Sequence, residues 1–278
     1  MPTSKVVLVK GPRNLDTVYK CLNLLGGLET ILEGIDKILI KVNFISTKTY
    51  DTGVTTDPLL VEGLIRKALE FAEVSVVESD ATTTDADKAC EATGMLRLCN
   101  DTGVKFLNLR HQEGRISIPV PKGEILKEIT IPRIVAESGI VNAAKLKTHM
   151  QTGVSLGMKN LFGLLPEKWK FKYHLRDINK VVVDVASVLR PKLTVIDGFY
   201  ALEGPGPSRG SPVKMDLLIA GTDIVATDAT ACRVMGIDPS EIFHIAKAYE
   251  KGLGEMNGNR IEIIGDAIEE VKRIFRRA

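Results

Sequence analysis

The stretch KILIKVNFISTKTYDTGVTTDPLLVEGLIRKALEFAEVSVV, residues 37–77, carries the pattern that decides the fold class. Its first six and its last five residues are short runs rich in Val and Ile, typical of strands buried on both faces of a parallel sheet. Between them, Asp57-Pro58 combines a helix N-cap with a first-turn proline, and apolar residues follow at helical spacing. The stretch therefore predicts a strand, a helix and a second strand in succession.

The same alternation continues through most of the chain. Further apolar runs of strand length lie at 5–10, 139–143, 193–197, 217–221 and 261–264. Helical spacing of apolar residues recurs at 14–25, 174–190, 223–235, 239–251 and 266–277. Strands that alternate with helices predict an α/β fold with a mainly parallel sheet flanked by helices.

Residues 101–135 interrupt this alternation with short β-like pieces. The segment also concentrates turn-forming residues, namely Gly114, Pro119, Pro121, Gly123 and Pro132. We expect a small antiparallel insertion here. Because the chain contains no repeat, low-complexity linker or long charge run, residues 1–278 are interpreted as a single α/β domain with this β insertion near 101–135.

Composition and charge narrow the function classes. The chain has 278 residues, of which 44% are hydrophobic and 26% charged, ordinary values for a globular protein. Thirty-seven Lys and Arg against 35 Asp and Glu leave a formal net charge of +2, so a surface built mainly to bind nucleic acid is not expected. A small molecule is the simpler ligand, and the sequence leaves the oligomeric state open.

The four cysteines, at positions 21, 90, 99 and 232, include no pair two residues apart. This spacing provides no zinc motif and no iron–sulfur cluster motif, and it indicates reduced thiols. The N-terminus begins a strand at once without a signal-peptide pattern, and no window approaches the roughly 20 apolar residues that span a bilayer. We therefore expect a cytoplasmic protein that does not contact membranes.

Ligands of open α/β sheets bind beyond the carboxyl ends of the strands, where loops lead into helices. That rule selects Asn43, residues 78–80, residues 145–149 and the segment from Asp197 onward. Loops with polar side chains are also the usual location of function. We expect the binding site at this edge of the sheet.

Residues 145–180 carry a local excess of positive charge, with seven lysines and one arginine against two acidic residues. This excess favours an anion site for a carboxylate or phosphate group, with Lys145 and Lys147 as clamps. A solvated basic surface is the alternative. Within the segment, KWKFKYH (168–174) alternates basic and aromatic residues. A half-buried strand or loop explains that pattern better than stacking on single-stranded nucleic acid.

Three residues of this segment are candidates for chemistry. His149 follows a predicted buried strand, where an imidazole can be directed into a cleft for acid–base work or metal ligation. Lys159 lies in a mainly apolar context, SLGMKNLFG, in which a lysine needs a depressed pKa, a covalent role or a route to solvent. His174 starts a predicted helix and is either a site residue or a surface residue near the helix cap.

The segment VIDGFYALEGPGPSRGSP (195–212) follows another predicted strand. Asp197 at the strand end is a candidate acid, base or metal ligand, and Glu203 lies six residues on. Gly204 and Gly206 would let backbone amides approach an anion, and Arg209 is a further anion contact. The Gly-Lys-Ser/Thr ending of a P-loop is absent, and a rigid Pro/Gly turn is the alternative.

Five blocks of sequence resemble the domain-of-unknown-function 362 family. They are KVNF (41–44), TTDP (55–58), KLKTH with TGVSLGMKNLFG (145–163), IDGFYALEGPGPSRGSP (196–212) and TDIVATDATACRVMG (222–236). Many members of that family carry a ferredoxin-like iron–sulfur module, which implies a redox role or a separate iron–sulfur partner. This chain lacks the cysteines of such a module.

The family is in turn similar to lactate racemase, whose nickel-pincer nucleotide is tethered to a lysine and whose nickel is ligated by a histidine. In that enzyme a catalytic histidine precedes the tethering lysine, and the nickel-binding histidine follows it. Here His149 precedes Lys159 at the same spacing, ten residues, and His174 follows Lys159 by fifteen. The resemblance implies Lys159 as the tether and His174 as the metal ligand. For the racemase's second catalytic histidine, further upstream, this chain offers His111 at a different spacing.

These observations predict an enzyme that acts on a small anionic metabolite, with racemase- or isomerase-like chemistry and a metal-bearing or lysine-tethered cofactor. His149, Lys159 and Asp197 form the predicted catalytic set, and His174 is the predicted metal ligand. The predicted cofactor-binding set comprises Lys145, Lys147, Asn160, Glu203, Gly204, Gly206 and Arg209. The alternatives are a non-catalytic protein that binds an anionic cofactor and a partner of an iron–sulfur redox protein.

Overall fold

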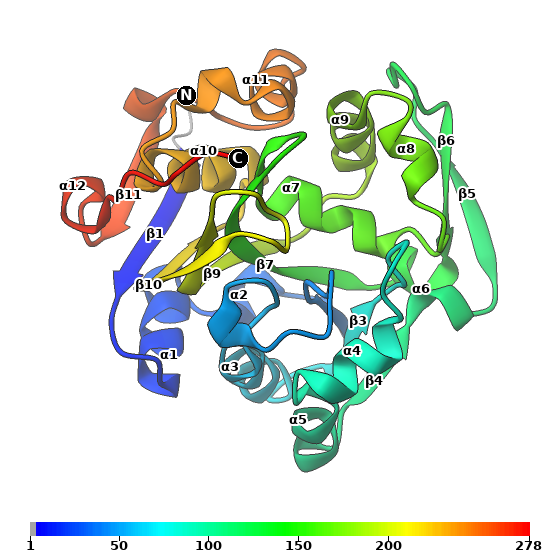
Figure 1. The fold of residues 1–278 in the computed structure, drawn as a ribbon. Helices are drawn as coiled ribbons and strands as arrows, with labels where there is room; N and C mark the ends of the chain where they lie inside the picture. The colour runs from blue at the N-terminus through cyan, green and yellow to red at the C-terminus, as the bar shows by residue number, and fades with distance from the viewer. Residues whose placement is uncertain (1–3) are drawn as a thin grey trace.

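The computed structural model describes residues 4–278. In it, the apolar runs of the chain form a nine-stranded sheet (Figure 1). Across the sheet the strands follow in the order Ile261–Gly265 (β11), Ser4–Lys10 (β1), Ser211–Gly221 (β10), Leu193–Glu203 (β9), Gly139–His149 (β7), Lys37–Lys41 (β2), Glu73–Glu78 (β3) and Lys105–Asn108 (β4). Gly153–Ser155 (β8) pairs with β7 off this path. Strand β10 is antiparallel to β1 and β9, whereas the other neighbours in this order are parallel. The predicted α/β fold with a mainly parallel sheet is therefore confirmed.

Helices cover both faces of the sheet (Figure 1). On one face lie Leu15–Leu24 (α1), Pro58–Ala68 (α3), Ala86–Ala92 (α4) and Met95–Thr102 (α5). On the other face lie Gly157–Asn160 (α7), Ile178–Val188 (α9), Ile224–Val234 (α10) and Phe243–Glu250 (α11). Four short helices complete the set: Leu28–Ile31 (α2), Arg133–Ala136 (α6), Phe171–His174 (α8) and Ile268–Val271 (α12). As predicted, Asp57 caps α3, accepting a hydrogen bond from the backbone N–H of Leu59.

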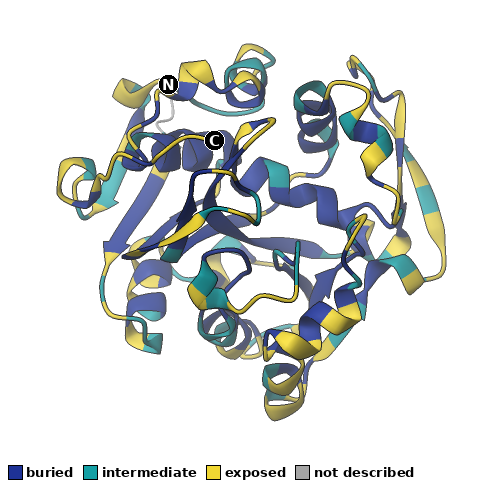
Figure 2. Cartoon of the chain, in the orientation of Figure 1, coloured by how far each residue is buried: buried dark blue, intermediate teal, exposed yellow. Residues whose placement is uncertain are grey.

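Alternate residues of β7 enter two separate cores, one on each face of the sheet. Val141 and Ala143 pack in the core beneath α1 and α3, whereas Ala144 and Leu146 pack in the core beneath α9 and α10. Every residue of β7 is buried, and Figure 2 shows the same for most of the central strands. A polar side chain on this strand must therefore find its partners inside the protein.

Three strands extend well beyond the apolar runs that predicted them, and one of these, β10, begins at Ser211 where the run begins at 217. β7 continues from the predicted 139–143 to His149, and β9 continues from 193–197 to Glu203. Both extensions are paired, because β8 is antiparallel to the end of β7 and β10 pairs with β9 up to its last residue. His149 and Glu203 therefore belong to strands and not to the loops that follow them.

The predicted helix at 266–277 is wrong beyond its first turn, α12. The segment that follows crosses the C-terminal end of α10 instead. There the backbone N–H groups of Arg273 and Phe275 donate to the carbonyls of Val234 and Met235, at 2.9 and 3.0 Å. These bonds satisfy carbonyl groups that the end of a helix leaves unpaired, so tertiary contacts override the helical spacing of the segment.

The antiparallel insertion is confirmed, and it covers fewer residues than predicted. Lys105–Asn108 is the edge strand β4 of the main sheet, so the separate hairpin comprises Arg115–Pro119 (β5) and Glu128–Pro132 (β6). The chain between β5 and β6 is held to α9 by Asp184. Its buried carboxylate accepts three backbone N–H groups, from residues 124–126, at 2.8 to 3.0 Å.

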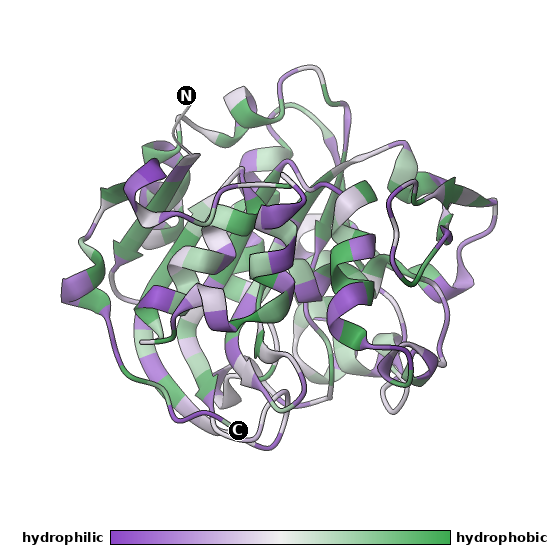
Figure 3. Cartoon of the chain, turned by 90° about the horizontal axis from the view of Figure 1, so that it is seen from above, coloured by the Kyte–Doolittle hydropathy of each residue, from purple (hydrophilic) through white to green (hydrophobic). Residues whose placement is uncertain are grey.

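Hydropathy follows the same layering. In Figure 3 the strands are mainly hydrophobic, while hydrophilic residues occupy the loops and alternate with hydrophobic ones along the helices. Among the helices described in residues 4–278, none combines the length and the apolar character needed to cross a bilayer. The four cysteines are free and buried.

Candidate functional site

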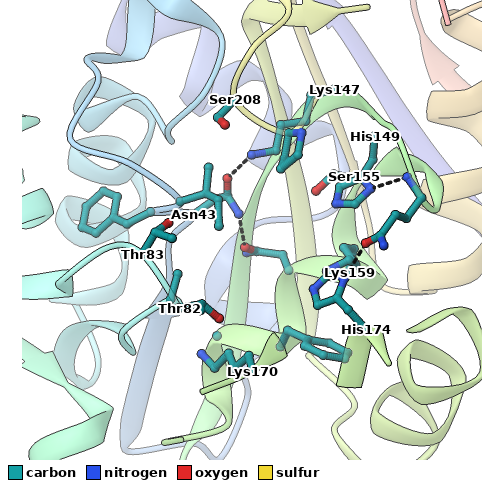
Figure 4. Close-up of a pocket in the computed structure, with 18 of the residues that line it drawn as sticks. Asn43, Thr82, Thr83, Lys147, His149, Ser155, Lys159, Lys170, His174 and Ser208 are labelled. Carbon is teal, nitrogen blue, oxygen red and sulfur yellow. Dashed lines mark hydrogen bonds between the residues drawn. The ribbon is translucent and has the colours of Figure 1, made fainter. Parts of the chain in front are cut away.

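A cavity of about 500 Å³ opens at the carboxyl ends of β2, β3 and β7 (Figure 4). Asn43 lies two residues after β2, Glu78 ends β3 and His149 ends β7, and all three line the cavity. The remaining walls come from residues 44–45 after β2, from 79–83 after β3, from 150–163 with α7, from α8 with Lys170 before it, and from the loop 205–209. The cavity therefore lies where open α/β sheets bind their ligands.

The lining of the cavity is rich in positive charge. It includes four lysines, Lys41, Lys147, Lys159 and Lys170. Among the described lining residues Glu78 is the one carboxylate, and it lies 2.9 Å from Nζ of Lys41. Positive charges in a cavity with low-dielectric walls raise the local concentration of anions.

Lys147 projects from β7 and is enclosed by protein. Its Nζ donates to Oδ1 of Asn43 at 2.5 Å and to the carbonyl of Val54 at 3.0 Å. Asn43 in turn donates to Oδ1 of Asn160 at 2.9 Å. Figure 4 draws the hydrogen bonds of Asn43 as dashed lines. Burial, followed by the charges of neighbouring lysines, lowers the pKa of Lys147 well below its ordinary value. Asn43 and the carbonyl of Val54 therefore fix an amino group that has no carboxylate within ion-pair distance among the described residues.

Lys159 on α7 and Lys170 before α8 also face the cavity (Figure 4). Burial lowers the pKa of each to about 8, and for Lys159 the charge of Lys170 adds to the effect. Nζ of Lys170 donates to Oγ of Ser79 at 2.5 Å. Nζ of Lys159 lies 4.6 Å from the ring centroid of Phe162, and nothing within residues 4–278 accepts a hydrogen bond from it.

The tautomer of His149 follows from its backbone contacts. Nδ1 accepts hydrogen bonds from the N–H groups of Gln151 at 3.1 Å and Thr152 at 3.3 Å. Because an accepting ring nitrogen carries no proton, the neutral ring holds its proton on Nε2. Burial, with the charges of Lys159 and Lys147, lowers the pKa of His149 to about 2. His149 is therefore neutral near pH 7 and offers Nε2–H as a hydrogen-bond donor.

His174 has the opposite tautomer. Its Nδ1 lies 2.5 Å from Oε1 of Gln151 and stands as the donor, because an amide oxygen only accepts. Nε2 is then unprotonated and carries a free lone pair. Burial, with the charge of Lys159, lowers the pKa of His174 to about 4, and the ring stacks on Phe171 with centroids 6.2 Å apart. Gln151 thus contacts both imidazoles, through its backbone and its side chain, and sets one as donor and one as acceptor.

The predicted site residues Lys145 and Asp197 do not line the cavity. They form a 2.8 Å ion pair in which neither side chain is exposed. The carboxylate also accepts the backbone N–H groups of Asp57 at 2.8 Å and Phe199 at 3.0 Å. The pair therefore joins β7, β9 and the start of α3.

Glu203, Gly204 and Gly206 also lie outside the lining. Glu203 pairs with Arg276 at 3.1 Å. The N–H of Gly204 donates to the carbonyl of Arg276, and the N–H of Gly206 donates to the carbonyl of Gly204. Neither amide is directed at a ligand. Of the residues predicted in this segment, Arg209 does line the cavity, and its side chain is exposed to solvent.

The structure brings six of the predicted residues together around the cavity: His149, Lys159, Lys147, Asn160, Arg209 and His174. The sequence did not single out Lys41 or Gln151. Lys41 had a detectable signal, because it stands between the apolar residues 38–40 and Val42, in a run that is otherwise typical of a buried strand. Gln151 had none, because its role depends on two rings from separate segments.

The basic and aromatic alternation at 168–174 comes from a half-buried loop that leads into a short helix, so of the two predicted conformations the loop is confirmed and the strand is wrong. Residues 168–170 form a loop, and 171–174 form the single-turn helix α8. Lys170 and Tyr173 are buried, whereas Trp169 is 63% exposed. The pattern therefore places one lysine in the cavity and leaves the tryptophan at the surface.

Within residues 4–278 no three His, Cys, Asp or Glu side chains group closely enough to hold a metal ion. Among the described residues that line the cavity, His174 has the one histidine nitrogen, Nε2, that carries no proton and makes no hydrogen bond, so it could bind a metal ion. A metal at this place would need most of its ligands from a bound molecule.

Comparison with known proteins adds a family and a relative. The sequence profile of a domain of unknown function, DUF362, matches residues 38–233, a range that includes every lining residue named above. Over 246 aligned residues the chain is 27% identical to thylakoid-associated protein sll1697 of Synechocystis sp. The alignment covers 86% of this chain and 75% of that protein.

Proposed function

The chain belongs to the DUF362 family, a domain of unknown function, and we propose that it is an enzyme acting on a small anionic metabolite bound in the lysine-lined cavity. The observation that carries the proposal is the charge of that cavity. Four lysines face one carboxylate, and the carboxylate is already paired with Lys41. The depressed pKa values of Lys147, Lys159 and Lys170 reflect first the cost of burying a charged amino group and second the repulsion between neighbouring lysines. An anionic ligand would offset both effects by favouring the charged form of each lysine.

The reaction class that suits the two imidazoles is proton removal beside a carboxylate, as in a racemase or isomerase. Nε2 of His174 would accept the proton, because it carries the lone pair. Nε2–H of His149 would donate a hydrogen bond to the substrate oxygen on which negative charge develops. The acid–base role expected of His149 thus becomes that of a neutral donor in this proposal. Lys159 would neutralise the charge of the substrate.

A nickel-pincer nucleotide, which the resemblance to lactate racemase implies, is compatible with these residues. Lys159 would tether it, Nε2 of His174 would be the protein ligand to its metal, and Lys147 and Lys170 would face its phosphate. When bound, such a group would supply an electrophilic centre for racemising a 2-hydroxy acid. The chain's own residues would still bind, orient and exchange protons with the substrate.

Two other functions use the same cavity. A non-catalytic protein that binds an anionic cofactor would keep the lysines and tolerate the loss of His174. A partner of an iron–sulfur redox protein would need the cluster from a separate chain, since the cysteines here are buried and free. We propose a cytoplasmic location on the basis of those free thiols. The name of the relative, a thylakoid-associated protein, makes attachment to a membrane surface the alternative that fractionation of the native cell would test.

Anion binding is tested by thermal unfolding and calorimetric titration with phosphate and malonate against chloride. We expect either anion at 100 times its Kd to stabilise the protein by about 2.7 kcal/mol. Lys147→Met should abolish this stabilisation, whereas Lys214→Met, at a lysine with a 60% exposed side chain, should retain it. No stabilisation of the wild-type protein by any anion would contradict the proposal.

Catalysis is tested by NMR detection of deuterium incorporation at the carbon beside the carboxylate of 2-hydroxy acids in heavy water. We expect incorporation with the wild-type protein and none with His174→Gln, while the variant still binds malonate. Anion binding by the wild-type protein without any incorporation would favour the non-catalytic alternative.

A further inference from the structure

The four lysines of the cavity differ in what holds their amino groups. Three of them donate to fixed oxygen acceptors: Lys41, Lys147 and Lys170. Lys159 is the exception, because its Nζ has the ring of Phe162 at 4.6 Å and no acceptor within residues 4–278. An amino group without fixed acceptors is free to turn its lone pair toward a ligand.

The position of Lys159 is nevertheless fixed. It lies on α7, whose first two backbone N–H groups donate to the buried carboxylate of Asp228 at 2.7 and 2.9 Å. The ring of Phe162 is held in turn by an edge contact with Tyr173, with centroids 5.6 Å apart. The structure thus fixes the backbone of Lys159 and the ring beside its amino group, and leaves the amino group itself unpaired.

We propose that Lys159 forms an imine with the carbonyl carbon of an anionic ligand, an aldehyde or ketone that carries a carboxylate or phosphate. The inference rests on the proposed function, because the other positive charges of the cavity must hold the anionic group of that ligand. It adds a covalent step and, within the class of small anionic metabolites, selects aldehydes and ketones in place of 2-hydroxy acids.

The step balances without an oxidant, a reductant or a metal. Nζ loses a proton and attacks the carbonyl carbon, and the electron pair of the C=O bond moves to oxygen. The C–O bond of the resulting carbinolamine then breaks, and oxygen leaves as water while the C=N bond forms. An ammonium and a carbonyl compound thus become a protonated imine and one water, with no net change in charge.

The two imidazoles provide the proton transfers that these steps need. Nε2 of His174, which has the free lone pair, accepts the first proton that leaves Nζ of Lys159 and returns it to the oxygen of the carbinolamine. The second proton of the departing water comes from the carbinolamine nitrogen itself. Nε2–H of His149 donates a hydrogen bond to the carbonyl oxygen as negative charge develops on it. The depressed pKa of Lys159, about 8, supports the same assignment because a larger share of the amine is neutral near pH 7.5 than for an ordinary lysine.

The cavity is large enough for a ligand well beyond three or four carbons. Its volume of about 500 Å³ falls within the range of sites that enclose cofactors and drug-sized molecules. Pyridoxal phosphate is a suitable probe, since it combines an aldehyde and a phosphate in one molecule. Pyridoxine phosphate is the matched control, because an alcohol replaces the aldehyde and the anionic group stays the same.

The experiment measures the affinity of both probes and traps the imine. The protein is incubated with one equivalent of either probe and reduced with borohydride, and the adduct is located by peptide mass spectrometry. We expect one phosphopyridoxyl group per chain on Lys159 and at least about tenfold tighter binding of the aldehyde than of the alcohol. Lys159→Arg and Lys159→Met should bind both probes equally and form no adduct in the cavity. Lys214→Met should behave as the wild type.

The outcomes separate the imine from the anion site. If both probes bind with equal affinity and Lys159 is not labelled, the imine is wrong and the anion site stands. If neither probe binds and phosphate and malonate also fail to stabilise the protein, the proposed function itself is wrong. Labelling of surface lysines in preference to Lys159 would likewise overturn the imine.

Discussion

Nζ of Lys145 and Oδ2 of Asp197 lie 2.8 Å apart on adjacent parallel strands, and neither side chain is exposed to solvent. Removing one partner leaves the other charge buried without compensation. We therefore expect Asp197→Ala to lower the free energy of unfolding by about 3–5 kcal/mol, measured by urea denaturation. The double variant Lys145→Met with Asp197→Leu should recover most of that loss. A single variant that loses less than about 1 kcal/mol would show that the pair does not hold the sheet together.

Anion affinity should depend on pH with a defined sign. The pKa values of Lys159 and Lys170 are about 8 in the free protein, and a bound anion would raise both. Binding should therefore be nearly independent of pH well below pH 8, where both lysines are already protonated, and weaken above it, with uptake of up to one proton by each lysine per bound anion. Calorimetry at pH 8.5 in two buffers of different ionisation enthalpy measures that uptake directly. Lys170→Met should remove about half of it. Affinity that rises above pH 8 would contradict the assignment.

The tautomers of the two cavity histidines should differ. Nitrogen-15 NMR of the imidazole rings at pH 7 should show the proton of His149 on Nε2 and that of His174 on Nδ1. In Gln151→Ala the side-chain acceptor of His174 is lost, so its ring should populate both tautomers. His149 should be unchanged there, because its partner is the backbone N–H of residue 151 and the substitution keeps that group. A change confined to His149 would refute the arrangement.

Gly206 should resist substitution more than its neighbour Gly204. A Cβ on Gly206 would collide with the backbone carbonyl of Thr148, so Gly206→Ala must displace the loop that carries Arg209. We expect a loss of about 1–3 kcal/mol in unfolding free energy and weaker anion binding. Gly204→Ala meets no atom within 4 Å, and its φ of +84° should cost about 1–2 kcal/mol without affecting binding. Equal effects of the two variants on anion affinity would contradict the role given to the loop.

Much of the fold was predictable because burial repeats along the chain. The apolar runs at 37–42 and 73–77 became strands, and the cap at Asp57 began the helix between them. The predictions that failed depend on contacts between distant segments. The residues after α12 have helical spacing, yet their backbone bonds to the end of α10 hold them in another conformation. The edge strand β4 was taken for part of the insertion because four residues give little pattern.

The candidate site was predictable in location and only partly in composition. Charge and strand-end position identified Lys147, His149 and Lys159, which the cavity does bring together. The same reasoning selected Lys145 and Asp197, which are equally polar and equally close to strand ends. Sequence does not distinguish a charge that faces a cavity from one that is neutralised inside the sheet. That distinction depends on partners from other strands, such as the carboxylate that pairs with Lys145.

Strand β7 carries Lys145, Lys147 and His149 at every second position, so the pair that holds the sheet together and two of the cavity's polar groups share one backbone. Any change that shifts this strand moves all three at once, which makes the floor of the cavity difficult to redesign by small steps. Thr82, Thr83 and Arg209 line the cavity walls from exposed positions on loops and take no part in the strand pairing. Substitutions that change which ligand binds, in nature or in the laboratory, should therefore occur in the loop residues of the walls, while the residues of β7 stay the same.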